Sequence, residues 1–357
     1  MSTTTDTQPI IDTDIHPQPV SFADIAAYLP REYRELSFGS IGEVGGHRGS
    51  GNPHGVDRRD AIPEQGPGGS SWPLMKEQLF DKYNLTYGIL TPASGLGACV
   101  HPNGEYGAAL ASAYNQWQAE TWWDLDPRIR GSILVAPQRP EKAVEEIRRW
   151  SEHPKAVQVL MSSATRVPLG DRDYWPIYKA ACDAGLPVAV HPGCEGTGIS
   201  NTFAAGMPYN YLEWHTNLSQ NYMGQITSLV VRGAFCEFPE LRFVGLEGGF
   251  SWLVHLMWRF DKNWKALRIV APWLKKAPSE YILDHVYLSS QPMEEPPKQA
   301  YLEQIFEMIQ AEKILMFSSD YPHWDNDCPI QALSRVKEPL KSRLLYQNAA
   351  ELYGLSL

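Results

Sequence analysis

Eight short apolar runs, rich in β-branched residues, recur along the chain and alternate with longer segments of helical periodicity. The expected strands cover residues 10–16, 85–90, 129–136, 156–161, 187–191, 241–246, 286–290 and 314–318. Six of the segments between them, 108–123, 141–150, 174–184, 220–235, 252–267 and 298–310, are expected helices. Strands that alternate with helices favour a parallel sheet, and eight such units predict an α/β fold, a closed (β/α)₈ TIM barrel.

A length of 357 residues would allow two domains, but α/β barrels often reach this size as one. We therefore expect a single barrel domain over residues 10–357. Residues 1–9 are Thr-rich and have neither a basic run nor an apolar stretch, so they are expected to be a frayed tail and not a secretory signal.

Two stretches interrupt the alternation, one after the first expected strand and one after the fifth. Residues 38–72 are rich in Gly, Pro and charge, and residues 193–217 mix Gly with aromatic residues. Long loops at these places are typical of substrate walls or lids, and packing against a second subunit is an equally good and compatible interpretation.

Composition excludes several classes of function. The chain has 31 Lys and Arg against 41 Asp and Glu, a net charge of −10, so neither nucleic acid nor an anionic membrane surface is an expected partner. No apolar run reaches the roughly 18 residues of a spanning helix. Five scattered cysteines without a C-x-x-C pair indicate reduced thiols, and we expect a soluble, cytoplasmic protein.

Ionisable residues follow the apolar strands. Side chains alternate along a strand, so those at positions 12, 14 and 16 share one face of the first strand. The polar residues at the four strand ends are Asp12, Asp14 and His16, His191, Glu247 and Asp320. In a barrel these strand ends converge on one rim, where reactive groups lie.

Two imidazoles and two carboxylates form a ligand set for one divalent metal ion with positions left open for water and substrate. The expected ligands are Asp14, His16, His191 and Asp320. Each alone has an ordinary explanation as a turn, a cap or a core histidine, but four at the ends of strands 1, 5 and 8 favour a metal site. Zn²⁺ or Mn²⁺ fits best, and Fe²⁺ is also admitted. Such an ion activates water or polarises a substrate oxygen.

Four motifs of the sequence resemble the amidohydrolase-related branch of the amidohydrolase superfamily, which includes aminocarboxymuconate semialdehyde decarboxylase and γ-resorcylate decarboxylase. The motifs are Asp-Thr-Asp-Ile-His at 12–16, Val-His-Pro-Gly at 190–193, Phe-Pro-Glu-Leu-Arg-Phe-Val-Gly-Leu-Glu-Gly-Gly-Phe at 238–250 and Met-Phe-Ser-Ser-Asp-Tyr-Pro-His at 316–323. The likeness extends from Asp12 to residues 348–354 and implies the same four metal ligands.

Two departures from the family pattern bear on the chemistry. Asp14 stands where the first strand of the family usually carries a histidine, and Glu247 stands where many relatives place a catalytic histidine before Gly-Gly. His215, His255 and His323 are the candidates to replace that histidine. We expect crowding of like charge to raise the pKa of Asp320 or Glu247, so that one of them serves as a base.

The expected function is a metal-dependent hydrolase of a small cyclic or aromatic carbonyl or carboxyl compound, because Glu247 suits water activation. The alternative is a non-oxidative decarboxylase, which the acidic first-strand ligand favours; a catalytically silent binding barrel is a third reading. Asp320 and Glu247 are the expected catalytic residues. The expected substrate contacts are Trp214, His215, His323, Trp324 and Arg58, although Arg58 also fits a solvated loop tip. The resemblance further implies a homo-oligomer, a dimer or a tetramer.

Overall fold

The structure, a computed structural model, describes residues 8–35 and 56–357. Its strands are β1 (Ile11–Ile15), β2 (Tyr87–Leu90), β3 (Ile129–Leu134), β4 (Ala156–Ser162), β5 (Val188–His191), β6 (Phe243–Gly245), β7 (Val286–Ser289) and β8 (Leu315–Met316). They form one sheet in the order β1 to β8, and all neighbouring pairs are parallel. All eight predicted strands are confirmed.

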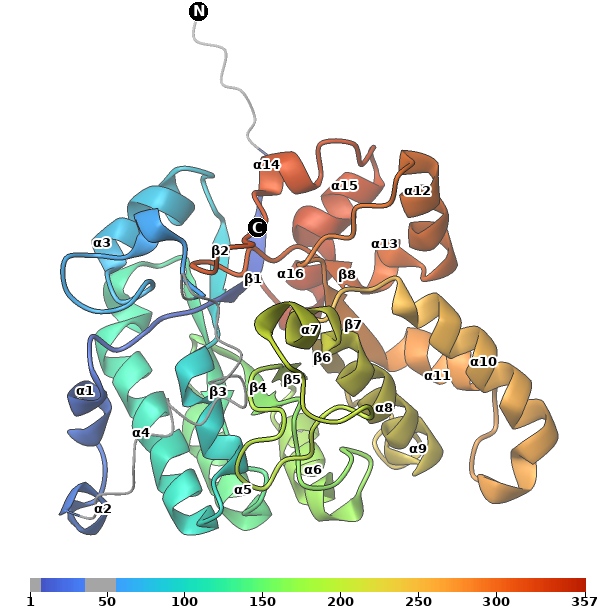
Figure 1. The fold of residues 1–357 in the computed structure, drawn as a ribbon, viewed down its shortest axis with the longest axis horizontal. Coiled ribbons are helices and arrows are strands. Elements are labelled where there is room, and N and C mark those ends of the chain that lie inside the picture. Colours follow the sequence, from blue (N-terminus) through green and yellow to red (C-terminus); the bar gives the residue numbers. More distant parts are fainter. Residues whose placement is uncertain (1–7, 36–55) are drawn as a thin grey trace, which may run out of the picture.

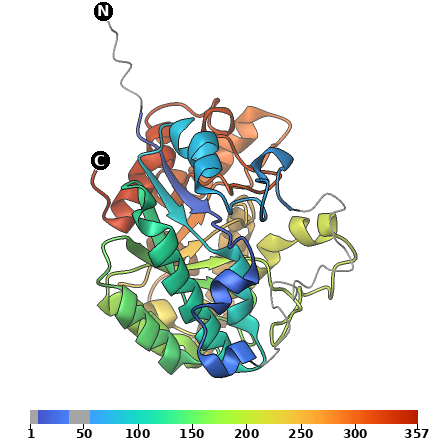
Figure 2. The same ribbon diagram turned by 90° about the vertical axis from the view of Figure 1, so that its left-hand side faces the viewer.

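The sheet closes because the segment after β8 returns to β1. The amide of Thr13 donates to the carbonyl of Phe317 at 3.1 Å, and the amide of His16 donates to the carbonyl of Tyr321 at 2.8 Å. Figures 1 and 2 show the strands enclosed by a ring of helices. This is the predicted (β/α)₈ barrel, with its long connections after β1 and β5.

Helices surround the barrel. The α-helices are α1 (Phe22–Ala26), α2 (Arg31–Glu35), α3 (Trp72–Met75), α4 (Gly104–Thr121), α5 (Pro140–Trp150), α6 (Trp175–Asp183), α7 (Tyr211–Thr216), α8 (Leu218–Val231), α9 (Ala234–Glu237), α10 (Trp252–Leu267), α11 (Pro278–His285), α12 (Gln299–Met308), α13 (Ala311–Ile314), α14 (Pro329–Ala332), α15 (Leu340–Ser342) and α16 (Asn348–Tyr353). Segments of 3₁₀- or π-helix are η3 (Arg59–Ala61), η4 (Lys76–Asp81), η5 (Ala93–Val100), η6 (Trp123–Leu125), η7 (Arg172–Tyr174), η8 (Arg268–Val270) and η9 (Arg343–Gln347).

Burial on both faces explains why the strands are so apolar. Val188, Ala189 and Val190 of β5 are fully buried, as expected of a parallel strand between the barrel interior and the helices. Among the described residues, no helix is both long and apolar enough to cross a membrane. Most of the predicted 1–9 tail, and positions 38–55 of the first long loop, lie outside the described residues.

The connection after β5 has a small apolar cluster of its own. Phe203, Trp214 and Leu218 are buried against one another, and Tyr211 packs on them. Helix α7 begins within this cluster, with the side chain of Asn210 accepting a hydrogen bond from the amide of Glu213. The cluster therefore places α7 at the carboxyl end of the barrel.

Candidate metal centre

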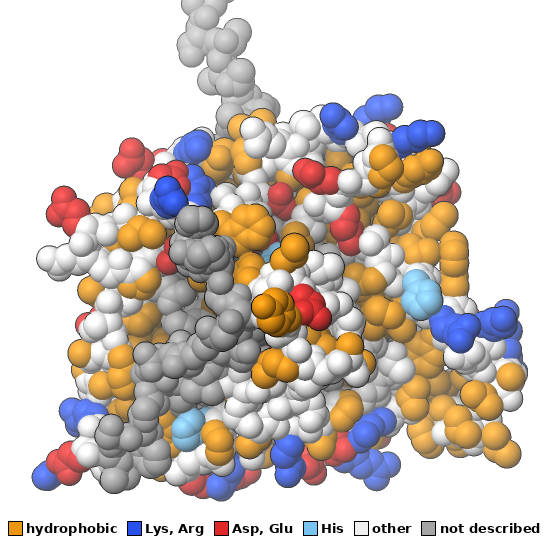
Figure 3. All heavy atoms as spheres, in the orientation of Figure 1, with side chains coloured by type: hydrophobic (Ala, Val, Ile, Leu, Met, Phe, Trp, Pro, Cys, Tyr) orange, Lys and Arg blue, Asp and Glu red, His pale blue; other side chains and the backbone are white. Residues whose placement is uncertain are grey.

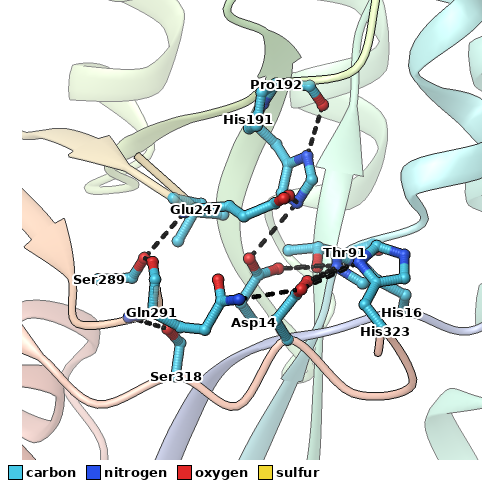
Figure 4. Close-up of polar contacts among 12 residues, drawn as sticks. Asp14, His16, Thr91, His191, Pro192, Glu247, Ser289, Gln291, Ser318 and His323 are labelled. Atoms are coloured by element: carbon cyan, nitrogen blue, oxygen red, sulfur yellow. Dashed lines mark hydrogen bonds and ion pairs between the residues drawn. The ribbon is translucent and has the colours of Figure 1, made fainter. Parts of the chain in front are cut away.

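The four predicted ligands meet at the carboxyl ends of the strands. Asp14 and His16 come from β1 and the residue after it, His191 ends β5, and Asp320 follows β8. Each offers one ligand atom, and these four atoms all lie within 4.8 Å of one another. All four residues are buried, and Figure 4 shows the rings of His16 and His191 next to the Asp14 carboxylate; their centroids lie 4.9 Å apart.

Both imidazoles turn a lone pair toward the carboxylates. The Nδ1 atoms of His16 and His191 lie 2.8 Å from the carbonyl of Thr91 and 2.7 Å from the carbonyl of Pro192. A carbonyl oxygen only accepts, so each Nδ1 carries a hydrogen, and in a neutral ring the Nε2 is then a bare acceptor.

Those Nε2 atoms face oxygens that are acceptors as well. His16 Nε2 lies 2.6 Å from Asp320 Oδ1, and His191 Nε2 lies 3.5 Å from Asp14 Oδ2. Neither His191 Nε2 nor Asp14 Oδ2 has a hydrogen-bond partner although both are buried. Ligands that are each about 2.1 Å from a divalent ion lie roughly 3 Å apart, so this set fits such an ion. Without an ion, burial disfavours the charged ring, but the charge of Asp14 outweighs it and holds the pKa of His191 well above its usual value.

Asp12 does not join the ligand set. Its Oδ1 accepts hydrogen bonds from the amides of Asp14 at 3.2 Å and Ser319 at 2.9 Å, so it ties β1 to the segment after β8. Burial raises its pKa to about 7.

Asp320 and Glu247 have pKa values displaced in opposite directions. Burial, together with the charge of Glu247, raises the pKa of Asp320 well above its usual value, as predicted. Burial also disfavours ionised Glu247, but the imidazoles of His191 and His215, whose Nε2 atoms lie 3.0 Å and 3.4 Å from its carboxylate oxygens, outweigh burial and hold its pKa well below the usual range. Of the two carboxyl groups, Asp320 is therefore the one with the raised pKa, and Glu247 is ionised.

A cavity of about 470 Å³ opens beside the ligands. Glu247 and His215 line it together with Asp325, Trp252 and Trp324. Of the described residues that line this cavity, none is a lysine or an arginine. Trp324 is half-exposed, and its Nε1 donates to the hydroxyl of Tyr211 at 3.4 Å.

The predicted substrate residues have different positions. His215 and Trp324 line the cavity, and His323 approaches Asp320, with 2.9 Å between Nδ1 and Oδ1. Trp214 is buried, and its Nε1 donates to Glu195 at 3.0 Å, so its ring packs behind the cavity. The Arg58 guanidinium pairs with Asp60 and also donates to Asn326 Oδ1 at 3.2 Å, and Arg58 is not among the residues that line the cavity.

His255, the remaining candidate for the replaced catalytic histidine, is exposed on α10. The other two candidates, His215 and His323, both reach the site, each with a ring nitrogen close to a carboxylate.

Sequence reasoning missed four residues that hold the site together: Thr91, Glu195, Gln291 and Asp325. Thr91 and Gln291 follow the strands β2 and β7, the same signal that identified the predicted ligands. The Nε2 of Gln291 donates to Asp320 Oδ2 at 3.2 Å and to Asp325 Oδ2 at 3.1 Å. Thr91 donates from its hydroxyl to Asp14.

Comparisons with known proteins agree with this geometry. The family model described as Amidohydrolase matches residues 11–355. Two similar solved structures are 5-carboxyvanillate decarboxylase from Sphingomonas paucimobilis (20% identity, 98% of this chain and 100% of that one, TM-score 0.68) and an amidohydrolase from Mycobacterium avium subsp. paratuberculosis K-10 (18%, 97% and 99%, 0.71). A third is dihydroxybenzoic acid decarboxylase from Polaromonas sp. JS666, solved with bound manganese and the inhibitor 2-nitroresorcinol (18%, 98% and 97%, 0.66). No curated protein sequence matches the chain.

Proposed function

The chain belongs to the amidohydrolase family, and on that premise we propose that it is a hydrolase that uses one divalent metal ion to activate water against a small cyclic or aromatic carbonyl compound. The observation that carries the proposal is the pair of buried Nε2 lone pairs of His16 and His191 turned toward carboxylates, next to ionised Glu247 at the cavity wall.

In this proposal Asp14, His16, His191 and Asp320 hold the ion. When bound, the ion lowers the pKa of a water molecule and polarises the substrate carbonyl. Zn²⁺ and Mn²⁺ suit two imidazoles and two carboxylates, Fe²⁺ is also admitted, and the manganese in the Polaromonas enzyme supports Mn²⁺. Ionised Glu247 receives a proton from the attacking water, and Asp320 is a second proton carrier.

Decarboxylation of an aromatic acid is the second candidate, because two of the three similar structures above are decarboxylases. The charges beside the cavity favour hydrolysis. Its described lining includes the carboxylates of Glu247, Glu294 and Asp325, against the single positive charge of His215. An uncharged carbonyl compound is accepted there more readily than a carboxylate anion.

Isotope labelling separates the two reactions. The metal-loaded enzyme is incubated in ¹⁸O-labelled water with aromatic esters, lactones, amides and acids, and metal-free enzyme is the control. Label in the organic product supports hydrolysis, whereas release of CO₂ without that label would show decarboxylation. Metal content well below one ion per chain after reconstitution would contradict both.

We also propose a small-molecule substrate, a cytoplasmic location and a homo-oligomer. The five cysteines are all free, in keeping with a reducing compartment. Figure 3 shows apolar side chains gathered at the lower right of the molecule. Large apolar side chains are exposed at the end of α10 and in the turn after it: Leu267, Ile269 and Val270. Burying them against a second copy would remove this surface from water.

A further inference from the structure

His215 lies on α7, at the cavity wall beside Glu247. Its Nε2 is 3.4 Å from Glu247 Oε1 and 3.1 Å from Asp325 Oδ2, and 15% of its side chain is exposed. Both contacts are ion pairs without the geometry of a hydrogen bond, so this buried nitrogen has carboxylates beside it but no hydrogen-bond acceptor. Burial disfavours the imidazolium, but Asp325 and Glu247 outweigh burial and raise the pKa of His215 to about 10. The ring therefore holds a proton that no protein group accepts in a hydrogen bond.

The surrounding structure fixes the position of this ring. Gln291 donates to Asp325 on one side, and the ring of Tyr211 stacks on His215 with 5.6 Å between centroids. The neighbouring Trp214 donates to Glu195, which also accepts from Ser163 at 3.1 Å and Asn221 at 3.0 Å. His323, the other histidine at the site, instead has its Nδ1 at Asp320 and its ring 4.6 Å from that of His16. His323 thus lies on the metal-ligand side, and His215 lies on the cavity side.

We propose that His215 is the proton donor to the leaving group of the hydrolysis and that Glu247 returns the proton to it, an inference that rests on the proposed hydrolase function. The attacking water bonds through oxygen to the carbonyl carbon and gives one proton to Glu247. When the bond from that carbon to the leaving atom breaks, its electron pair takes the proton from Nε2 of His215. Glu247, whose Oε1 faces the same nitrogen, then passes its proton to His215, and both residues regain their initial state.

The presence of a proton donor at the cavity wall indicates which class of substrate the site serves. A leaving group needs a donated proton only when its anion is a strong base. The donor is therefore expected to serve uncharged amides, lactones or esters of weakly acidic alcohols, whereas activated esters, whose leaving group departs as a stable anion, are cleaved with little need of it.

The test compares leaving groups in His215→Gln and Asp325→Asn, with the exposed His255→Gln as matched control. The metal-loaded proteins, with metal content measured for each, are assayed on aryl acetates from phenyl acetate to 4-nitrophenyl acetate. We expect His215→Gln to lower kcat/KM by about 100-fold for phenyl acetate and by less than about 3-fold for 4-nitrophenyl acetate. Asp325→Asn should also lower kcat/KM more for phenyl acetate than for 4-nitrophenyl acetate. His255→Gln should leave kcat/KM unchanged for every ester.

Two outcomes would overturn the assignment of His215: equal losses along the whole series, or no loss, in a variant that binds metal normally. If His215→Gln loses its metal, Asp325→Asn takes its place in the test. The assignment is then judged by whether its loss in kcat/KM is larger for phenyl acetate than for 4-nitrophenyl acetate. A wild-type enzyme that cleaves none of the esters, amides or lactones but releases CO₂ from aromatic acids would instead contradict the proposed hydrolase, and the assignment with it.

Discussion

Asp320 combines a metal-facing carboxylate with a left-handed backbone, φ 61°. Asparagine tolerates that conformation, so Asp320→Asn should keep the fold while it removes a ligand charge and a proton carrier. We expect turnover to fall by about 1,000-fold or more. The measurement is kcat together with metal content, and Asp327→Asn in the same loop is the control. Activity close to wild type would refute the role of Asp320.

Asp327 affects the pH dependence of stability. Burial raises its pKa to about 6, above the usual aspartate value of 3.8. Between these values the folded state holds a proton that the unfolded state has lost, so this residue's contribution to stability is full below about pH 4 and disappears as pH rises through 6.

The variant Asp327→Asn removes that titration and keeps an acceptor for the amide of Met293. Relative to wild type, its free energy of unfolding should be higher at pH 7 than at pH 4.5 by about 1–2 kcal/mol, allowing for partial solvent exposure. Urea denaturation at both pH values measures the difference. A variant-to-wild-type difference that does not change with pH would contradict it.

Among the elements, the β5–α7 connection depends on a single buried carboxylate. Glu195 is fully buried and accepts hydrogen bonds from Ser163, Trp214, Asn221 and the amide of Gly193. We expect Glu195→Ala to leave these donors unpaired and to lower the free energy of unfolding by about 3 kcal/mol or more. Chemical denaturation checks this, with exposed Glu152→Ala as control. If Glu195→Ala lowers the free energy of unfolding no more than Glu152→Ala does, the hydrogen bonds of Glu195 do not stabilise the connection that carries α7.

At the scale of the whole molecule, the metal ion should stabilise the fold. Asp14, Glu247 and Asp320 lie close together in a buried site, and a cation that binds only the folded chain shifts the equilibrium toward it. We expect chelation to lower the melting temperature by about 5 °C or more and added Zn²⁺ or Mn²⁺ to restore it. Calorimetry measures the change, with Asp14→Asn as the ion-insensitive comparison. An unchanged melting temperature on chelation would contradict the proposed ion.

The strands and the meeting of four ionisable side chains at one rim were predictable from the sequence for one physical reason. A buried parallel strand is apolar along its length, so a polar residue at its end is conspicuous, and barrel geometry brings all carboxyl ends to one rim. That is why the clustering of Asp14, His16, His191 and Asp320 could be expected from the sequence, while their role as metal ligands stays a proposal. The single-domain organisation stays a prediction.

The loop residues could not be predicted in the same way. Trp214 and His215 are neighbours in sequence, yet the indole of Trp214 is buried against Glu195 and the ring of His215 lines the cavity. Their directions depend on how α7 packs, which a sequence pattern without strand periodicity does not encode.

The sequence by itself determined the barrel, the rim and the types of ionisable residue at that rim, because alternation of strand and helix and the contrast of apolar with ionisable residues are local properties of the chain. Only the tertiary structure decided which side chains meet across the mouth. Gln291 joins Asp320 to Asp325, and Asp325 meets His215, through contacts between residues far apart in the sequence. Such pairings depend on the folded paths of the loops after β5, β7 and β8, which separate the proposed metal ligands from the proposed proton carriers at the cavity.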